Sequence, residues 1–256
     1  PMRVAGLPAF EDHCRWARVD DEGNAVIVDP GDAAPVLAAT ELGMWPAGIL
    51  LTHHHPDHCG GVAALRQRWP TLPVFAPEDE RITQATQRVG EGSRLQLNGW
   101  DFEVIAVPGH TLSHVAYHGE GGHLFCGDTL FSMGCGRMFE GTPPQMLASL
   151  DRLAALPSTT AVCCGHEYTM ANAAFALAVE PANDALHRRQ QEAQAMRHAG
   201  RPTLPTSIAQ ERETNPFLRT DVPAVREAVS RRLGRPPADR VETFAELRRW
   251  KDGFRA

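Results

Sequence analysis

The stretch THHHPDH, residues 52–58, places four histidines and one aspartate within seven positions. Imidazole is the commonest metal-binding side chain, and carboxylate is a good second ligand. The apolar residues that precede the motif predict a strand over 48–52, so the motif occupies the turn at the carboxyl end of that strand. An irregular turn lets successive side chains converge on one point, so this run predicts a metal site.

Three further candidate ligands have the same context. His110, Asp128 and His166 each follow a predicted strand, and each is preceded by glycine, in VPGHT, FCGDT and CCGHE. Glycine permits close backbone approach, and sites in open α/β sheets lie beyond the carboxyl ends of strands. We therefore expect one cluster of ligands formed by His53, His55, Asp57, His58, His110, Asp128 and His166. Six other histidines are expected not to bind metal, namely His13, His54, His118, His123, His187 and His198.

Seven ligands exceed the four that one zinc ion prefers. Two divalent metal ions fit better, with Asp128 bridging them. Two cations bound to one water lower its pKa toward neutrality. A site rich in His and Asp leaves coordination positions on the metals open, which suits hydrolysis. Zinc is favoured as the metal, although the ligand mixture does not separate it from iron or manganese.

The predicted elements indicate an α/β layered body followed by a helical tail. Short apolar runs predict strands over 25–29, 48–52, 73–76, 102–107, 124–127 and 160–163, and helices over 33–42, 62–69 and 145–156. Beyond residue 170 strand signals fade, and helices are predicted over 170–179, 184–199, 222–233 and 241–250. We expect two domains, residues 1–169 and 170–256.

Composition and charge restrict the classes of function. The 256 residues carry a net charge of -6, and 43% are hydrophobic, so a sizeable core is expected. No apolar run is long enough to span a membrane, and no export signal is visible, so a cytoplasmic protein is expected. Residues 174–256 hold 15 basic and 11 acidic side chains, which indicates either a solvated helical face or a site for a small anion. No concentrated basic stripe predicts nucleic-acid binding.

The motifs THHHPDH, PGHT, GDT and GHEY resemble the metallo-β-lactamase superfamily. Within it, IVDPGDAAPVL, FCGDTLF, GCGRMFEGT, CCGHEYT and the terminal RRWKDGF resemble the hydroxyacylglutathione hydrolase (glyoxalase II) family, over nearly the whole chain. The resemblance implies a four-layer αββα sandwich in residues 1–169 and a helical glutathione-binding domain in residues 170–256. It also implies a thioester hydrolase that converts S-D-lactoylglutathione to D-lactate and glutathione with a metal-bridging hydroxide.

The resemblance also implies roles for the candidate ligands. Asp57 would aim the hydroxide at the thioester, and Asp128 would bridge the metals, so both are expected to be catalytic. One metal would be held by His53, His55 and His110. The other would be held by Asp57, His58 and His166.

Substrate contacts are implied at five positions. Arg137 and Phe139 follow the GCG turn, and Phe139 stands where many members have tyrosine, so a phenolic hydrogen bond would be missing. Tyr168 matches a residue that contacts glutathione. Arg248 and Lys251 match a basic pair that holds the glycine carboxylate, and their spacing puts both on one face of a predicted helix.

Two further features concern the surroundings of the site. Where the family often has Asn-Tyr, this chain has His13 and Cys14 within PAFEDHCRW, which puts the substrate contacts of that loop in question. Asp29 ends a predicted strand. It is either a turn-forming residue or a partner that orients a ligating histidine.

Three alternatives stay open at the sequence level. A glutathione persulfide dioxygenase with a single iron shares the superfamily, although the helical tail with RRWKDGF argues against it. A lactonase or β-lactamase would leave the glutathione contacts without a purpose. A non-catalytic metal-binding module would be expected to lose ligands, and all seven positions are filled. The expected partner is the glutathione thioester alone, bound by a monomer.

Overall fold

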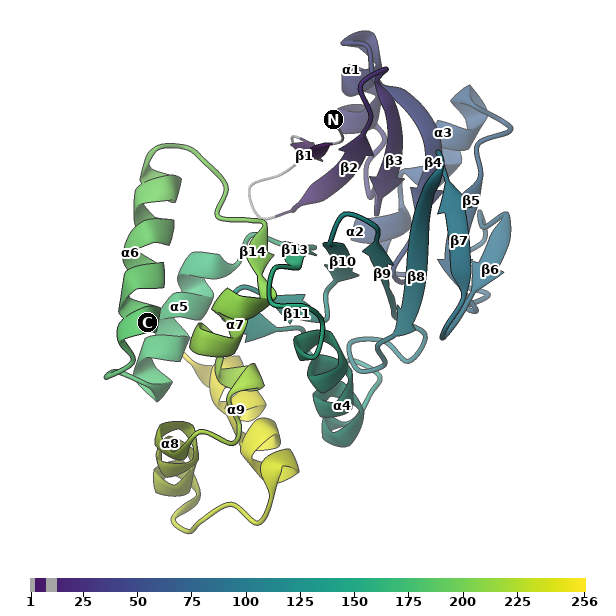
Figure 1. Ribbon diagram of the computed structural model, residues 1–256. Helices are drawn as coiled ribbons and strands as arrows, with labels where there is room; N and C mark the ends of the chain where they lie inside the picture. The colour runs from purple at the N-terminus through teal and green to yellow at the C-terminus, as the bar shows by residue number, and fades with distance from the viewer. Residues whose placement is uncertain (1–2, 8–12) are drawn as a thin grey trace.

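The computed structural model describes residues 3–7 and 13–256 (Figure 1). The segment 8–12, which begins the PAFEDHCRW stretch, lies outside the described residues. Two six-stranded sheets form the body of the molecule, and helices lie on their outer sides. None of the described helices has the length and apolar character that crossing a membrane requires.

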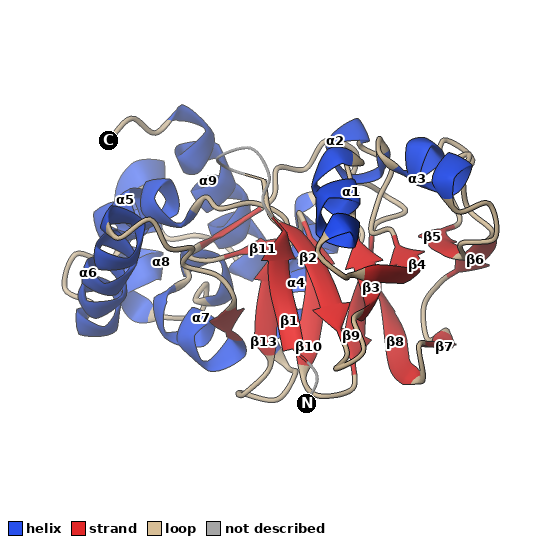
Figure 2. Cartoon of the chain, turned by 90° about the horizontal axis from the view of Figure 1, so that it is seen from above, coloured by secondary structure: helices blue, strands red, loops and turns tan. Residues whose placement is uncertain are grey.

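The first sheet has the strand order β1 to β6. Its strands are β1 (Arg3–Leu7), β2 (Arg15–Val19), β3 (Asn24–Val28), β4 (Trp45–Leu50), β5 (Val74–Pro77) and β6 (Gln87–Val89). The first three are antiparallel, whereas β3 to β6 run parallel. Three helices follow strands of this sheet and lie beside it, α1 (Ala34–Glu41), α2 (Pro56–Cys59) and α3 (Val62–Arg68) (Figure 2).

The second sheet has the order β14-β13-β10-β9-β8-β7. Its strands in chain order are β7 (Arg94–Leu97), β8 (Trp100–Ala106), β9 (Val115–Gly119), β10 (His123–Gly127), β13 (Ala161–Cys164) and β14 (Thr206–Ser207). Only β10 and β13 pair in parallel in this sheet. A small ribbon of β11 (Leu130–Phe131) and β12 (Gly134–Cys135) follows β10.

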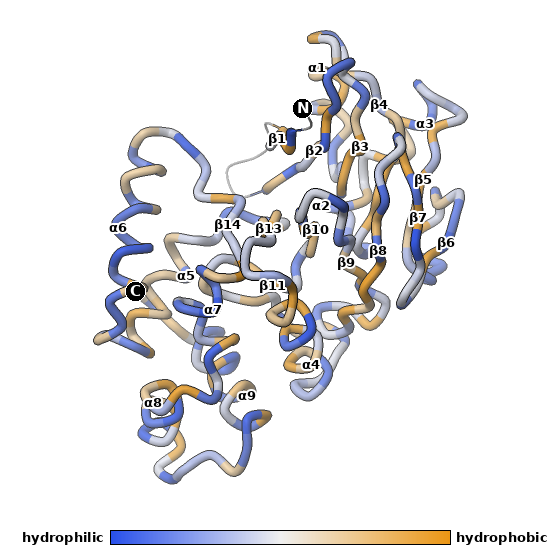
Figure 3. The backbone as a smooth tube through the Cα atoms, viewed as in Figure 1, coloured by the Kyte–Doolittle hydropathy of each residue, from blue (hydrophilic) through white to orange (hydrophobic). Residues whose placement is uncertain are grey.

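Side-chain alternation along the strands builds the layers. In β3, Val26 and Val28 belong to the core between the sheets, whereas Ala25 and Ile27 belong to the core beneath α1 and α3. Successive strand residues point to opposite faces, so both faces of this strand are buried. The strand β3 is accordingly apolar over residues 25–28 (Figure 3). The result is the predicted αββα sandwich.

The fourth layer and the tail are helical. The helices are α4 (Pro143–Ala154), α5 (Thr169–Val179), α6 (Asp184–His198), α7 (Ile208–Thr214), the 3-10 turn η1 (Pro216–Leu218), α8 (Pro223–Leu233) and α9 (Arg240–Gly253). Phe175, Phe217 and Phe244 are buried and contact one another in series. They join the core that contains Leu150 of α4, so the tail is packed onto the body.

The predicted strands and helices all occur, with ends shifted by a few residues. Several strands were not predicted, among them β2, β9 and β14. The strand β14 lies in the tail but pairs with β13, so the tail adds an edge strand to the second sheet. Two residues are too short a run for alternation to be visible, so no strand is predicted there.

Candidate metal centre

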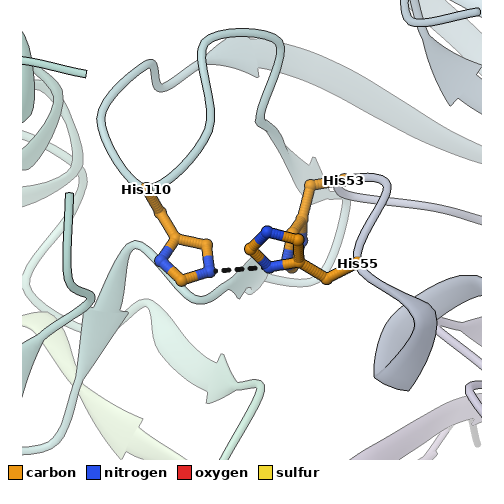
Figure 4. Close-up of side chains that lie close together, drawn as sticks. All are labelled: His53, His55 and His110. Atoms are coloured by element: carbon orange, nitrogen blue, oxygen red, sulfur yellow. Dashed lines mark hydrogen bonds between the residues drawn. The ribbon is translucent and has the colours of Figure 1, made fainter. Parts of the chain in front are cut away.

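The loops that follow the strands bring the seven predicted ligands together in two sets. The first set is His53, His55 and His110, and one side-chain nitrogen of each lies within 4.8 Å of the others. Figure 4 shows the three rings converging from two loops, with Nε2 of His110 at 3.1 Å from Nδ1 of His55. Among the described residues, the buried Nε2 of His53 has no hydrogen-bond partner. Three converging imidazole nitrogens are a suitable donor set for a divalent cation.

The second set is Asp57, His58, Asp128 and His166. Asp57 Oδ2 lies 3.3 Å from Nε2 of both His58 and His166. The two histidine nitrogens lie 3.4 Å apart. Oxygen and nitrogen donors thus face one small volume, which a cation would fill.

Asp128 lies between the two sets. One carboxylate oxygen lies 3.2 Å from Nε2 of His58, and the other lies 3.4 Å from Nε2 of His110 and 3.3 Å from that of His166. Nε2 of His53 is 3.9 Å from the same second oxygen. The geometry therefore allows one carboxylate to reach two cations at once.

Partners behind the rings fix their orientation. Asp29 accepts hydrogen bonds from Nδ1 of His58 at 2.9 Å and from the amide and hydroxyl of Thr52 at 2.8 and 2.6 Å. Because that hydroxyl donates to Asp29, it accepts from Nδ1 of His53 at 2.8 Å. Nδ1 of His110 donates to the carbonyl of Arg137 at 2.8 Å. These bonds leave Nε2 of each ring directed inward, as ligation requires.

The charge balance of the first set favours metal binding. Burial lowers the pKa of His53 well below its usual value, and burial also lowers the pKa of His55 and of His110. These three imidazoles are therefore neutral near pH 7, and the neutral form is the one that binds a cation.

The second set carries the negative charge. Burial opposes a charge on His166, but Asp128 and Asp57 raise its pKa to about 9. Burial likewise opposes a charge on His58, and the nearby carboxylates raise its pKa well above its usual value. The carboxylates thus draw protons onto these histidines. A metal ion would supply the positive charge that these protons supply in its absence. The residues of the second set therefore suit a bound divalent cation.

Two of the glycines that precede ligands are required by the crowding of the site. A Cβ atom on Gly165 would lie 2.4 Å from Oδ1 of Asp128. Gly127 has a φ of 51°, and a Cβ atom there would lie 2.6 Å from the hydroxyl of Thr52. The backbone therefore approaches the ligands more closely than any other residue type allows.

His114 was missed by sequence reasoning. It is fully buried, its ring stacks on that of His53 at 4.4 Å, and its Nε2 accepts the amide of Asp128 at 3.2 Å. It therefore packs against a histidine of the first set and holds the backbone of the residue that carries the central carboxylate. Its spacing of four residues from His110 in PGHTLSH is the signal that could have indicated it.

Two other histidines lie beside the ligands. His13 lines the same pocket, with its ring 4.8 Å from that of His166 and its Nε2 3.7 Å from Oδ2 of Asp57. His54 turns away from the cluster, and its Nδ1 lies 3.6 Å from Asp79.

A pocket of about 650 Å³ opens onto the metal centre. Tyr168 stacks on His166, with ring centroids 4.8 Å apart and planes inclined by 4°. Phe139 is 64% exposed, and its ring meets those of His55 and His110 edge-on. All five predicted substrate contacts line this pocket, namely Arg137, Phe139, Tyr168, Arg248 and Lys251.

The two basic residues of α9 differ in their surroundings. Arg248 is 6% exposed, and it donates to the carbonyl of Cys135 at 2.7 Å and to Asp252 at 3.1 Å. Lys251 is half-buried, and its pKa is lowered by burial and by the charges of Arg248 and Arg137. Together with Arg137, they form a cationic wall on one side of the pocket.

Comparisons with known proteins agree with this geometry. Residues 11–166 match the metallo-beta-lactamase superfamily, and residues 167–254 match the hydroxyacylglutathione hydrolase C-terminus. A hydroxyacylglutathione hydrolase of Xanthomonas axonopodis pv. citri (strain 306) is 62% identical over 256 residues, which is all of both chains. One of Xylella fastidiosa (strain M23) is 58% identical over 253 residues, covering 99% of this chain and 98% of that one.

Solved structures share the fold. The BLEG-1 B3 metallo-beta-lactamase is 26% identical with a TM-score of 0.64, covering 84% of this chain and 99% of that one. TTHA1623 in a di-iron-bound form is 28% identical with a TM-score of 0.59, covering 84% of this chain and all of that one. The relatives are similar over their full length, and both residues 11–166 and residues 167–254 match family models. The chain therefore belongs to the hydroxyacylglutathione hydrolase family of the metallo-β-lactamase superfamily.

Proposed function

We propose that this protein hydrolyses hydroxyacylglutathione thioesters, converting S-D-lactoylglutathione to D-lactate and glutathione. The observation that carries the proposal is the position of Asp128, whose carboxylate touches both ligand sets at the base of a pocket with a cationic wall. The names of relatives that match the whole chain support the same reaction.

Two divalent metal ions are proposed, one in each set, with Asp128 between them. When bound, such ions lower the pKa of water toward neutrality and polarise the thioester carbonyl. Zinc is the proposed metal because imidazole and carboxylate are among its usual ligands. Iron is the alternative, and the di-iron-bound form of a structural relative supports it.

Asp57 is proposed to orient the attacking water. Its side chain is 39% exposed and faces the pocket, whereas that of Asp128 is 8% exposed. Hydrogen bonds from His166 and His58 hold its pKa well below the usual value, so it stays an acceptor at neutral pH. A carboxylate in this position would accept a hydrogen bond from the water and aim its oxygen at the carbonyl carbon. Asp29 would orient His58 from behind.

The leaving group places few demands on the protein. An ordinary thiol has a pKa near 8.5, so a thiolate departs with little help from a general acid. No protein nucleophile is needed either. Cys59 lies next to His58 in sequence, but burial raises the pKa of its thiol, which keeps it in the unreactive form.

The cationic wall is proposed to bind the glutathione moiety. Arg248 and Lys251 would hold its glycine carboxylate, with Arg137 near the mouth of the pocket and Tyr168 and Phe139 beside the metal centre. Such contacts position the scissile bond relative to the attacking water. Because every one of these side chains comes from one chain, we infer that a monomer suffices.

The division of labour between two domains is also a proposal. Residues 1–169 would supply the metal centre, and residues 170–256 would supply most of the glutathione contacts. The start of α5 at Thr169 and the boundary between the two family matches support it. A cytoplasmic location is inferred because reduced thiols such as glutathione belong to reducing compartments.

Hydrolysis of S-D-lactoylglutathione by protein of measured metal content tests the proposal. Loss of thioester absorbance at a rate that follows metal content is expected. Absence of hydrolysis from fully metal-loaded protein would rule the function out. Oxygen consumption with glutathione persulfide in a parallel assay would instead support the dioxygenase alternative.

A further inference from the structure

A carboxylate lies within the cationic wall. Asp252, near the end of α9, is half-exposed, and its Oδ1 accepts a hydrogen bond from Arg248 at 3.1 Å. The same oxygen lies 3.8 Å from Nε of Arg137. Lys251 precedes it in the sequence and carries the third positive charge of the wall. Two of the three cations at the edge of the pocket thus lie against the same internal anion.

Arg248 does not depend on Asp252 for its position. One guanidinium nitrogen donates to the carbonyl of Cys135 at 2.7 Å, and the group lies over the ring of Phe217 at 5.3 Å. An asparagine at position 252 would keep a side-chain oxygen as acceptor for the other nitrogen. Asp252→Asn therefore removes a charge while it leaves the geometry of the wall largely unchanged.

We propose that Asp252 weakens anion binding at the cationic wall and thereby speeds release of glutathione. The proposal rests on the proposed function, because glutathione is the product of that reaction. Substrate and product carry the same glutathione carboxylates. A wall without Asp252 would hold both more tightly, and such uniform binding lowers KM without accelerating the chemical step.

The expected size of the effect follows from Coulomb's law. Removing one unit charge several ångströms from a bound carboxylate changes anion affinity by about 3- to 10-fold at an intermediate effective dielectric constant. Both Asp252 and Arg137 are partly exposed, so dissolved salt will screen much of this difference. The salt dependence separates a charge effect from a change in shape.

The test compares wild type, Asp252→Asn and the control Glu41→Gln at equal metal content. Glu41 is exposed on α1, far from α9 (Figure 1), so its variant makes the same change in net charge away from the wall. Calorimetric titration with glutathione gives Kd, and hydrolysis of S-D-lactoylglutathione gives KM and kcat, each at about 50 and 300 mM salt.

For Asp252→Asn, Kd and KM are expected to fall about 3- to 10-fold at low salt, with a smaller fall at high salt and no gain in kcat. Glu41→Gln should match wild type. An unchanged or raised Kd in folded Asp252→Asn would overturn the inference. Should that variant not fold, Asp252→Ser is measured in its place with the same criteria. If wild type binds glutathione but hydrolyses no thioester, the proposed function is wrong. The role of Asp252 is still decided in that case, because it is tested by the Kd for glutathione.

Discussion

The metal centre and the cationic wall share one pocket, but they are held in different ways. His53, His58 and Asp128 are almost completely buried. Hydrogen bonds from behind fix the rings of the two histidines, and the main-chain amide of Asp128 donates to His114. In the wall, Arg137 is mostly exposed and Lys251 is half-buried. Among the three cations of the wall, Arg248 alone is both buried and held by a hydrogen bond to a main-chain carbonyl.

This difference indicates a division between chemistry and affinity. Buried ligands with fixed rings preorganise a cation site, and small displacements there are costly to the chemical step. Partly exposed charges contribute to binding through interactions that solvent and salt weaken. Changes in the metal centre should therefore alter metal content and kcat, and changes in the wall should alter KM.

Asp128→Ala should give the largest effect. Asp128 contacts members of both ligand sets, so its loss is expected to reduce metal content and to lower kcat by at least about a thousandfold, because water is no longer ionised near neutral pH. Metal analysis and thioester hydrolysis on the same preparation check this. Full metal content in the variant would contradict a bridging role and would weaken the contrast between the two regions.

Asp29→Asn tests whether partners behind the ligands matter. Asp29 accepts from His58 and twice from Thr52, and an amide cannot accept all three hydrogen bonds. Metal affinity is expected to fall about 10- to 100-fold. Competition with a chromophoric chelator measures it. Asp32→Asn is the control, because Asp32 is exposed and its carboxylate accepts a hydrogen bond from the amide of Ala34, away from the ligands. Equal metal affinities in the two variants would show that Asp29 does not position His58.

The sequence predicted the metal centre better than its surroundings. The residues of THHHPDH, His110, Asp128 and His166 are ligand types placed after apolar runs, so both their chemistry and their position at strand ends were visible. The parallel pairing of β3 with β4 and of β10 with β13 then brings those ends together. His114 was not predicted, because it lies at the start of a strand and its stacking on His53 is a tertiary contact.

Other features depend on packing that no local pattern records. The strand β2 carries Arg15 and Arg18, both buried, which an alternation of apolar and polar residues does not predict. The burial of Arg248 depends on the distant residues Cys135 and Phe217. The spacing of Arg248 and Lys251 predicted that both lie on one face of a helix. It did not predict that Arg248 is buried and fixed whereas Lys251 is half-exposed.

Lys251→Ala tests the wall. KM for S-D-lactoylglutathione is expected to rise about 10-fold while kcat stays within about twofold, because uniform binding is lost and the metal centre is unchanged. Steady-state kinetics check this, with Arg249→Ala as the control. Arg249 is exposed on the same helix and pairs with Glu246, outside the pocket. A variant with unchanged KM and strongly reduced kcat would place Lys251 with the chemistry instead.

Phe139→Tyr should give the smallest effect, and it probes the border between the two regions. Phe139 is exposed beside His55 and His110 but lines the pocket that the wall faces. A phenolic hydroxyl would add one hydrogen bond to the substrate, so KM is expected to fall about two- to threefold with kcat unchanged. Phe139→Leu is the control for loss of the ring, and metal content should stay constant in both. A fall in kcat or metal content in Phe139→Tyr would instead assign Phe139 to the metal centre, where its edge contacts with the two histidines would help to hold them.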